Sequence, residues 1–143
     1  MIKGGILFKR REIKKGKAIP EGFTECETDK VTGKTVGWVP VIQSDPSNKW
    51  HVQAFELLLS HFPPKEGTYE LIGPKIQGNP EGALAHYLIK HSEADIYLDV
   101  RRDYDGLEEF LKDRDIEGLV FHHSDGLYAK IRKSDFNQKR RTK

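Results

Sequence analysis

The stretch Glu117–Phe136, EGLVFHHSDGLYAKIRKSDF, decides how the C-terminal part of the chain folds. It holds two β-rich runs, residues 118–122 and 127–132, on either side of an Asp-Gly pair. Asp-Gly between two apolar runs is the strongest short-range signal for a β-hairpin. The stretch therefore predicts two antiparallel strands joined by a tight turn.

The predicted hairpin carries charged side chains in a regular pattern. Successive residues of a strand point to opposite faces, so Lys130 and Arg132 share one face. Glu117 stands at the entry of the first strand. A carboxylate that can hold a divalent cation, beside two fixed cations, suits a polyphosphate ligand. A sheet edge with solvated charges explains the same residues, and the pattern alone leaves both interpretations open.

Composition indicates a globular intracellular protein. The 143 residues suit one domain with a real core, and 36% are hydrophobic and 32% charged. We expect no membrane association, because no apolar run approaches the length of a span and the start lacks a signal peptide's apolar segment. The single cysteine, Cys26, excludes an internal disulfide and lies among acidic residues, so we interpret it as structural or incidental.

The net charge of +2 is unevenly distributed. Residues 9–17 and 130–143 are rich in Lys and Arg, whereas acids dominate 93–117. Basic ends around an acidic middle suggest a phosphate-binding face opposite a solvated one. Two ordinary solvated segments are the alternative, and we favour it for the basic tail, residues 137–143, because terminal tails are usually disordered.

The remaining pattern predicts an α+β fold with a mainly antiparallel sheet and two to three helices in one domain. The expected strands cover residues 4–11, 35–42, 68–72 and 96–100, with Pro40 indicating an edge strand or a bend. Helices are expected from Asp45-Pro46 to about His61 and from Asp103 or Asp105 to about Arg114. Residues 83–91 fit a helix or a strand.

Three common site types are not expected. The histidine pairs, His86 with His91 and His122 with His123, do not have zinc-ligand spacing. No phosphate-binding GxxxxGK[ST] loop is present. Ser124 lies in a turn without a hydrolase elbow.

Several motifs, in order, resemble the covalent nucleotidyltransferases, which comprise ATP-dependent ligases and mRNA capping enzymes. EGLV at 117–120 resembles motif IV, AKIRKSDF at 129–136 resembles motif V, and YELIG at 69–73 resembles motif III. KRRE at 9–12 resembles the arginine segment that follows the nucleophile. With GWVPV at 37–41 and ELIGPKIQGNP at 70–80, the chain most resembles the stand-alone 5′-phosphate/3′-hydroxyl RNA ligases of the vertebrate type. The resemblance implies a ligase nucleotidyltransferase (ATP-grasp-like) core.

The resemblance also implies roles for particular residues. Lys130 and Arg132 would contact the α-phosphate of ATP as catalytic cations. Glu117 would help to hold Mg²⁺ or Mn²⁺, and Glu70 would face the ribose and the metal. Arg10, or Arg11 in its place, would touch the ribose, a phosphate or the reacting 5′ end. The implied partners are ATP and RNA ends with a 5′-phosphate and a 3′-hydroxyl, and we expect a monomer. Tyr97 or Tyr87 would stack on adenine, although either can equally be a core tyrosine.

The chain departs from the family at motif I. The sequence contains no K-x-D-G, whose lysine forms the lysyl-AMP intermediate. We expect that motif within about a dozen residues upstream of Met1, a distance set by one strand and its turn, in a domain truncated at its N-terminus. Two hypotheses follow: an RNA ligase domain that is inactive or incomplete without motif I, and a degenerate module that binds a nucleotide or an RNA end. A capping-type guanylyltransferase is a third, minor one.

Overall fold

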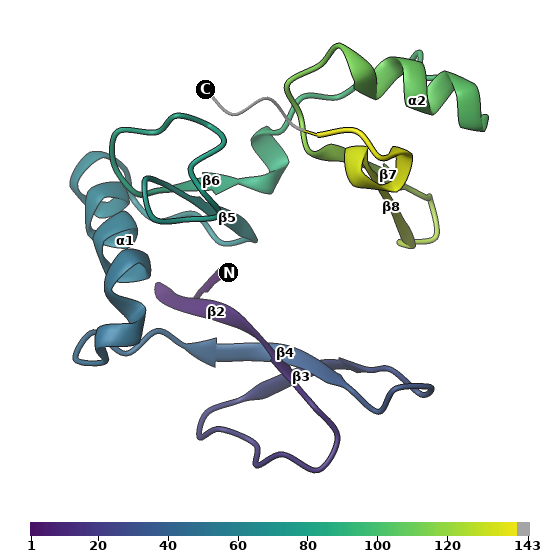
Figure 1. Cartoon of the computed structure of the whole chain (residues 1–143). Coiled ribbons are helices and arrows are strands. Elements are labelled where there is room, and N and C mark those ends of the chain that lie inside the picture. Colours follow the sequence, from purple (N-terminus) through teal and green to yellow (C-terminus); the bar gives the residue numbers. More distant parts are fainter. Residues whose placement is uncertain (140–143) are drawn as a thin grey trace. The chain divides into compact units, whose positions relative to one another are not determined.

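The computed structural model describes residues 1–139, which divide into two compact units, Met1–Ala94 and Asp95 onward. The described chain is α+β, with antiparallel sheets and two α-helices, as predicted (Figure 1). The strands form three sheets, however, where the sequence suggested one main sheet. The single-domain interpretation stays a prediction.

The larger sheet of unit 1 has four strands in the order β1-β2-β4-β3. They are β1 (Ile2–Lys3), β2 (Ile6–Ile13), β3 (Thr24–Thr28) and β4 (Thr35–Pro40). The prediction of one strand over 4–11 was wrong at its start, because Gly4 and Gly5 have positive φ and form a tight turn between β1 and β2. The alternative of an edge strand around Pro40 was also wrong, since β4 is an inner strand that ends at that proline.

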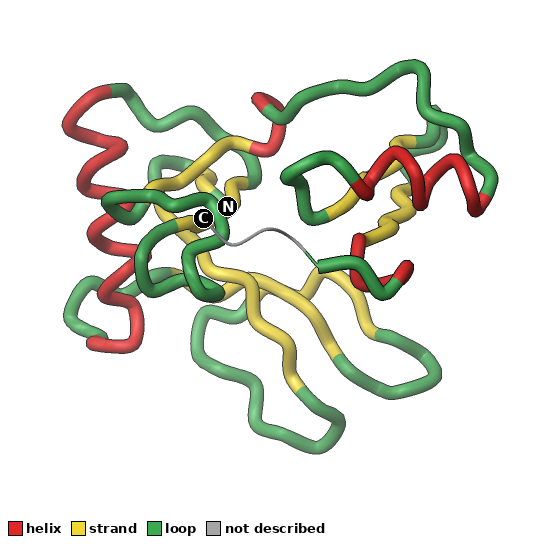
Figure 2. Tube along the Cα trace, turned by 45° about the horizontal axis from the view of Figure 1, so that its top comes forward, coloured by secondary structure: helices red, strands yellow, loops and turns green. Residues whose placement is uncertain are grey.

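The core of unit 1 lies where α1 (Lys49–His61) packs on the hairpin of β5 (Tyr69–Ile72) and β6 (Tyr87–Lys90). Figures 1 and 2 both show α1 running beside this hairpin. Ile2, Leu7, Ala54 and Leu88 form the buried cluster, which joins the helix, the hairpin and the larger sheet. The segment 83–91, for which the sequence left helix and strand open, forms a strand only at 87–90. A 3₁₀ turn, His91–Glu93, follows it.

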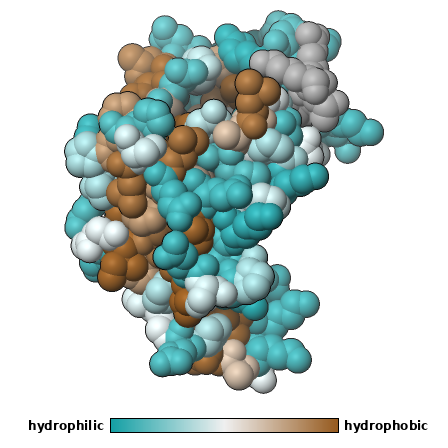
Figure 3. Space-filling model, turned by 90° about the vertical axis from the view of Figure 1, so that its left-hand side faces the viewer, coloured by the Kyte–Doolittle hydropathy of each residue, from teal (hydrophilic) through white to brown (hydrophobic). Residues whose placement is uncertain are grey.

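Hydrophobic side chains also reach the surface of unit 1. Figure 3 shows a band of hydrophobic residues on the side where α1 lies. A groove there is lined by the end of α1 and by β6, including Leu57, Phe62 and Tyr87. His61 is exposed at the edge of this groove, and its Nδ1 lies within hydrogen-bond distance of Leu57 O and Ser60 Oγ.

The start of α1 follows the predicted signal. The side chain of Asp45 accepts a hydrogen bond from the Ser47 amide, and Pro46 opens a 3₁₀ turn, Pro46–Asn48, that leads into the helix. Neither described α-helix is long and apolar enough to cross a membrane.

Unit 2 contains α2 (Tyr104–Lys112), the hairpin of β7 (Gly118–His122) and β8 (Tyr128–Arg132), and a 3₁₀ turn at Lys133–Phe136. Asp103 caps α2 by accepting a hydrogen bond from the Gly106 amide, as predicted. The prediction of a strand at 96–100 was wrong, because this segment pairs with no strand of the described chain. Ile96 and Leu98 are 84% and 86% exposed, so its alternating pattern does not cover a core. Of the predicted basic tail, residues 140–143 lie outside the described residues.

Candidate functional site

The β7–β8 hairpin confirms the prediction from the Asp-Gly signal. Gly118 pairs with Arg132, Val120 with Lys130 and His122 with Tyr128. Gly126 takes φ +81° in the turn, and its amide donates to the His123 carbonyl. At the other end, the Lys133 amide donates to the carbonyl of Glu117 at 2.9 Å. Glu117 is thereby fixed beside the end of β8.

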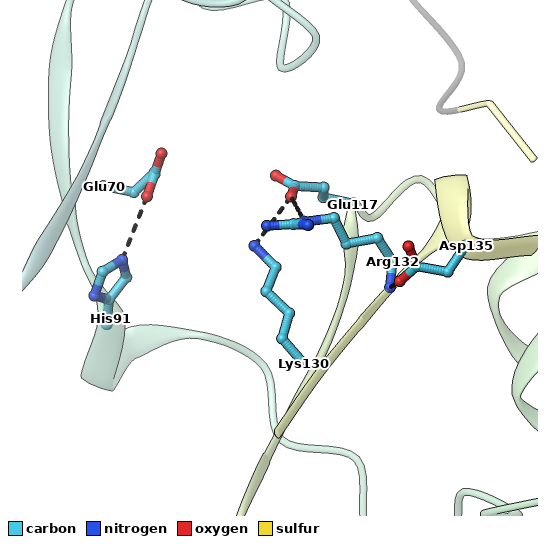
Figure 4. Close-up of polar contacts among 6 residues, drawn as sticks. All are labelled: Glu70, His91, Glu117, Lys130, Arg132 and Asp135. Atoms are coloured by element: carbon cyan, nitrogen blue, oxygen red, sulfur yellow. Dashed lines mark hydrogen bonds and ion pairs between the residues drawn. The ribbon is translucent and has the colours of Figure 1, made fainter. Parts of the chain in front are cut away.

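Three predicted site residues meet on this hairpin. Glu117 Oε1 accepts hydrogen bonds from Lys130 Nζ at 3.0 Å and from Arg132 Nε at 3.1 Å (Figure 4). All three side chains are about half exposed, at 54%, 45% and 52% respectively. We call these three residues the charge cluster. Because solvent screens the pairs, each contributes only about 0.2–1 kcal/mol to stability.

The cluster changes the titration of its carboxyl group. The hydrogen bond and charge of Lys130, helped by Arg132, lower the pKa of Glu117 below its usual value. Partial burial acts in the opposite direction and raises this pKa, but it does not prevail. Glu117 is therefore ionised throughout the neutral range.

The residues after β8 hold Arg132 in place. The Asp135 carboxylate accepts a hydrogen bond from the Arg132 amide at 2.8 Å (Figure 4). Phe136 is buried, and its ring contacts that of Tyr104 on α2 with centroids 5.0 Å apart. Lys133 is also buried, and its ammonium donates to the carbonyl of Lys112 at the end of α2. The acidic-aromatic pair of the motif V resemblance thus fastens β8 to the unit's helix.

Gly118 is the second residue of the motif IV resemblance. Only glycine fits at this position, because a side chain would collide with the neighbouring strand. A Cβ at this position would lie 2.1 Å from the carbonyl oxygen of Ile131 and 2.8 Å from the Cα of Arg132. Both are backbone atoms, so no side-chain rotation relieves the contact. The close approach of the strands brings Glu117 within reach of Arg132, and sequence reasoning did not identify this function of the glycine.

Glu70 lies on β5, in unit 1. Its carboxylate is 3.5 Å from His91 Nε2, with side chains 58% and 54% exposed (Figure 4). His91 Nδ1 lies 2.9 Å from the Thr68 hydroxyl. A mid-strand carboxylate needs a partner or a surface position, and Glu70 has both.

Arg10 and Arg11 point to opposite faces of the sheet in unit 1. Arg10 pairs with Trp38 and Arg11 with Gly37 on β4. Both side chains are exposed, and neither forms a side-chain hydrogen bond or an ion pair within the described chain. Since adjacent strand residues face opposite ways, only one of them can serve any one ligand on the sheet.

The two tyrosines considered for adenine stacking have different surroundings. Tyr97 lines a groove of about 970 Å³ in unit 2, between the segment 95–102 and the β7–β8 hairpin. Its ring meets Phe110 edge to face at 5.2 Å. Tyr87 lies on β6 of unit 1, where it borders the groove beside α1. The prediction that either residue stacks on adenine stays open.

A magnesium ion is compatible with the residues of the cluster. Mg²⁺ is usually held by one or two carboxylates together with phosphate oxygens and water, so one accessible carboxylate such as Glu117 fits it. Within residues 1–139, no three His, Cys, Asp or Glu side chains converge as a complete metal site.

Comparison with known proteins places the chain near RNA ligases. It is 34% identical over 128 residues to RNA ligase 1 of Pongo abelii, covering 69% of this chain and 39% of that protein. It is 31% identical over 153 residues to RNA ligase 1 of Rattus norvegicus and of Mus musculus, covering 80% of this chain and 47% of each relative. The chain thus spans less than half the length of these curated relatives. No protein-family model matches it. These similarities support an RNA ligase family.

Proposed function

We propose that this chain is part of the adenylyltransferase domain of an ATP-dependent RNA ligase that joins 5′-phosphate and 3′-hydroxyl RNA ends. The observation that carries the proposal is the charge cluster, in which two cations on one strand face share the oxygen of a carboxylate. The similarity to proteins named RNA ligase 1 supports the choice among phosphate chemistries.

The reaction of such a ligase has three phosphoryl-transfer steps. A lysine nitrogen attacks the α-phosphorus of ATP and pyrophosphate leaves. The AMP then passes to an RNA 5′-phosphate, which releases the lysine, and a 3′-hydroxyl attacks that phosphate and expels AMP. Catalysis of this kind consists mainly of positioning and charge neutralisation.

In this proposal Lys130 and Arg132 bind the α-phosphate and neutralise charge at phosphorus. Glu117 would hold Mg²⁺ or Mn²⁺, which would supply further neutralisation of phosphoryl oxygens, and Glu70 would serve the ribose and the metal. Arg10, or Arg11 from the opposite face, contacts the ribose, a phosphate or the 5′ end. The predictions of a monomer and an intracellular location accompany this proposal.

A second candidate is a module that binds a nucleotide or an RNA end without chemistry. Such a module would need no K-x-D-G lysine, and the 143 residues contain no K-x-D-G. Incubation of the chain with radiolabelled ATP and Mg²⁺ tests this candidate. We expect no covalent adduct from these residues alone, and a stable AMP adduct would contradict the module.

Binding of ATP with Mg²⁺, measured by isothermal titration calorimetry, tests the site itself. Lys130→Ala and Arg132→Ala should each weaken binding about tenfold or more, since each removes a charge-assisted contact of about 1.5–3 kcal/mol. Lys139→Ala is the matched control, because it removes the same charge outside the cluster. Equal affinities in all three variants would refute the site. Competition by GTP against ATP tests the capping-type alternative.

A further inference from the structure

The face of the hairpin that carries the two cations continues into a pair of exposed rings. Tyr128, Lys130 and Arg132 occupy alternate positions of β8, so their side chains share a face. Across the ladder, His122 pairs with Tyr128. The two rings meet edge to face, with centroids 4.6 Å apart and planes at 89°.

The ring pair is unusually open to solvent. Tyr128 is 69% exposed and its neighbour on this face, Val120, is 52% exposed. Edge-to-face contact with His122 fixes the phenol ring without covering it. A cross-strand aromatic pair also supports a hairpin, so a test must separate ligand binding from hairpin stability.

This face of β8 carries its ring at one end and its cations toward the other. Tyr128 and Arg132 are four residues apart, about 13 Å along a β-strand. One end offers two cations for a phosphate and the other offers a ring for a base. Tyr128 and His122 are also among the lining residues of the groove of unit 2, so this groove reaches the ring end.

Single-stranded nucleic acids are bound by this combination of cations that follow the backbone and aromatic rings that stack on bases. We propose that Tyr128, supported by His122, stacks on a base of a single-stranded RNA end whose phosphate lies on Lys130 and Arg132. The choice of RNA rests on the proposed function. The stacking site is additional to the α-phosphate contacts of that proposal.

The test uses the 143-residue chain and a 3′-fluorescein-labelled, 5′-phosphorylated single-stranded RNA of ten nucleotides, followed by fluorescence anisotropy. Tyr128→Val removes the ring but places another residue of high β-propensity in the strand, and it should weaken binding about 5- to 30-fold. Tyr128→Phe keeps the ring and should bind within about twofold of the unaltered chain. A blunt duplex of the same sequence should bind less tightly, because its bases are already stacked.

Salt dependence separates the two ends of the face. Lys130→Ala should reduce the slope of log affinity against log salt by about 0.7, the value for one phosphate contact on a single strand. Tyr128→Val should lower affinity without changing this slope. Amide hydrogen exchange of β7 and β8 in Tyr128→Val should stay within about threefold of the unaltered chain, which excludes hairpin loss as the cause.

The stacking site is refuted if Tyr128→Val binds the single strand as tightly as the unaltered chain, or if the duplex binds equally well. Its failure is distinguishable from failure of the proposed function. ATP binding that depends on Lys130 and Arg132, without any effect of Tyr128 on RNA, overturns only the stacking site. Dependence of RNA binding on Tyr128, without ATP binding, overturns only the ligase proposal.

Discussion

Replacing Gly118 by alanine should open the hairpin at the end that holds the charge cluster. The added Cβ would meet the Ile131 carbonyl oxygen at 2.1 Å, well inside the distance that Cβ contacts tolerate, and Arg132 Cα at 2.8 Å. Neither backbone atom can rotate away. The strands must separate, which strains the bond from the Lys133 amide to the Glu117 carbonyl.

The expected cost is about 2 kcal/mol. Overpacking of a close contact costs about 1–3 kcal/mol, and a weakened backbone hydrogen bond adds about 0.5–1.5 kcal/mol. Relaxation at this solvent-exposed end of the hairpin keeps the total cost near the sum of the two lower limits. A loss of 2 kcal/mol accelerates exchange of amides that need hairpin opening by about 30-fold.

Hydrogen exchange of residues 118–122 and 128–132 is the appropriate assay. Tryptophan fluorescence is not, because Trp38 and Trp50 both lie in unit 1. As Glu117 moves away from its cations, the pKa of its carboxyl should also rise toward the usual value, which carboxyl NMR measures. Unchanged exchange together with an unchanged pKa would refute the reasoning.

Gly126→Ala is the matched control within the same hairpin. Its Cβ meets no atom within 4 Å, but the residue has φ +81°. Alanine there costs about 1–2 kcal/mol of backbone strain. This variant should therefore exchange faster while the pKa of Glu117 stays low, which separates general loss of stability from loss of the cluster.

Three further variants test the surroundings of the site. Phe136→Ala should lose about 3–5 kcal/mol from unit 2, since the ring is 5% exposed, and exchange of α2 and β8 reports it. Asn48→Ala should destabilise unit 1 by about 1–3 kcal/mol, because it removes one hydrogen bond to the Ile42 carbonyl and one from the Lys9 ammonium. The Asp45 amide still bonds to that carbonyl and the Ser47 hydroxyl still accepts from that ammonium, and the urea midpoint followed by tryptophan fluorescence measures the loss. The folded-state pKa of Glu117 is lowered, so its stabilisation is complete above the unfolded pKa and is lost as pH falls through the folded one. Glu117→Gln should accordingly be less stable than the unaltered chain at pH 7 by up to about 1 kcal/mol, and equally stable at about pH 2.

Local patterns were sufficient to predict the hairpin and its charge cluster. The Asp-Gly turn fixes the register, and a period of two places Lys130 and Arg132 on one face. Glu117 joins them because the first residue before β7 lies beside the last residue of β8. All of this information is contained in about twenty consecutive residues.

Strand partners were not predictable in the same way. The segment 24–28, TECET, is polar and exposed throughout, yet it forms β3 because β4 offers it an edge. The apolar alternation at 96–100 suggested a strand, but no described strand pairs with it. Pairing depends on residues distant in sequence, so propensity alone misjudged both segments.

The functions of Gly118 and Lys133 were missed for different reasons. Gly118 has no side chain whose pattern reveals a steric limit, and only the distance to Ile131 does so. Lys133 belongs to a basic run that suggested a solvated segment, but the last turn of α2 supplies a carbonyl acceptor for its ammonium. Burial of a lysine with such an acceptor follows from the tertiary position of the helix end.

The sharing of one carboxylate oxygen has a consequence for ligand binding. Glu117 neutralises one of the two cationic charges, so a polyphosphate meets a net charge of only +1 and must displace the existing hydrogen bonds. If Mg²⁺ occupies the Glu117 carboxylate, Lys130 and Arg132 are free to bind phosphate, and linkage then requires each ligand to increase the affinity for the other.

Inorganic tripolyphosphate should therefore bind the unaltered chain more tightly with Mg²⁺ than without it. Glu117→Gln should bind it more tightly than the unaltered chain in the absence of Mg²⁺, and should gain little when the ion is added. Calorimetry in both conditions measures this difference, and an equal gain from Mg²⁺ in both proteins would show that Glu117 does not couple the two ligands.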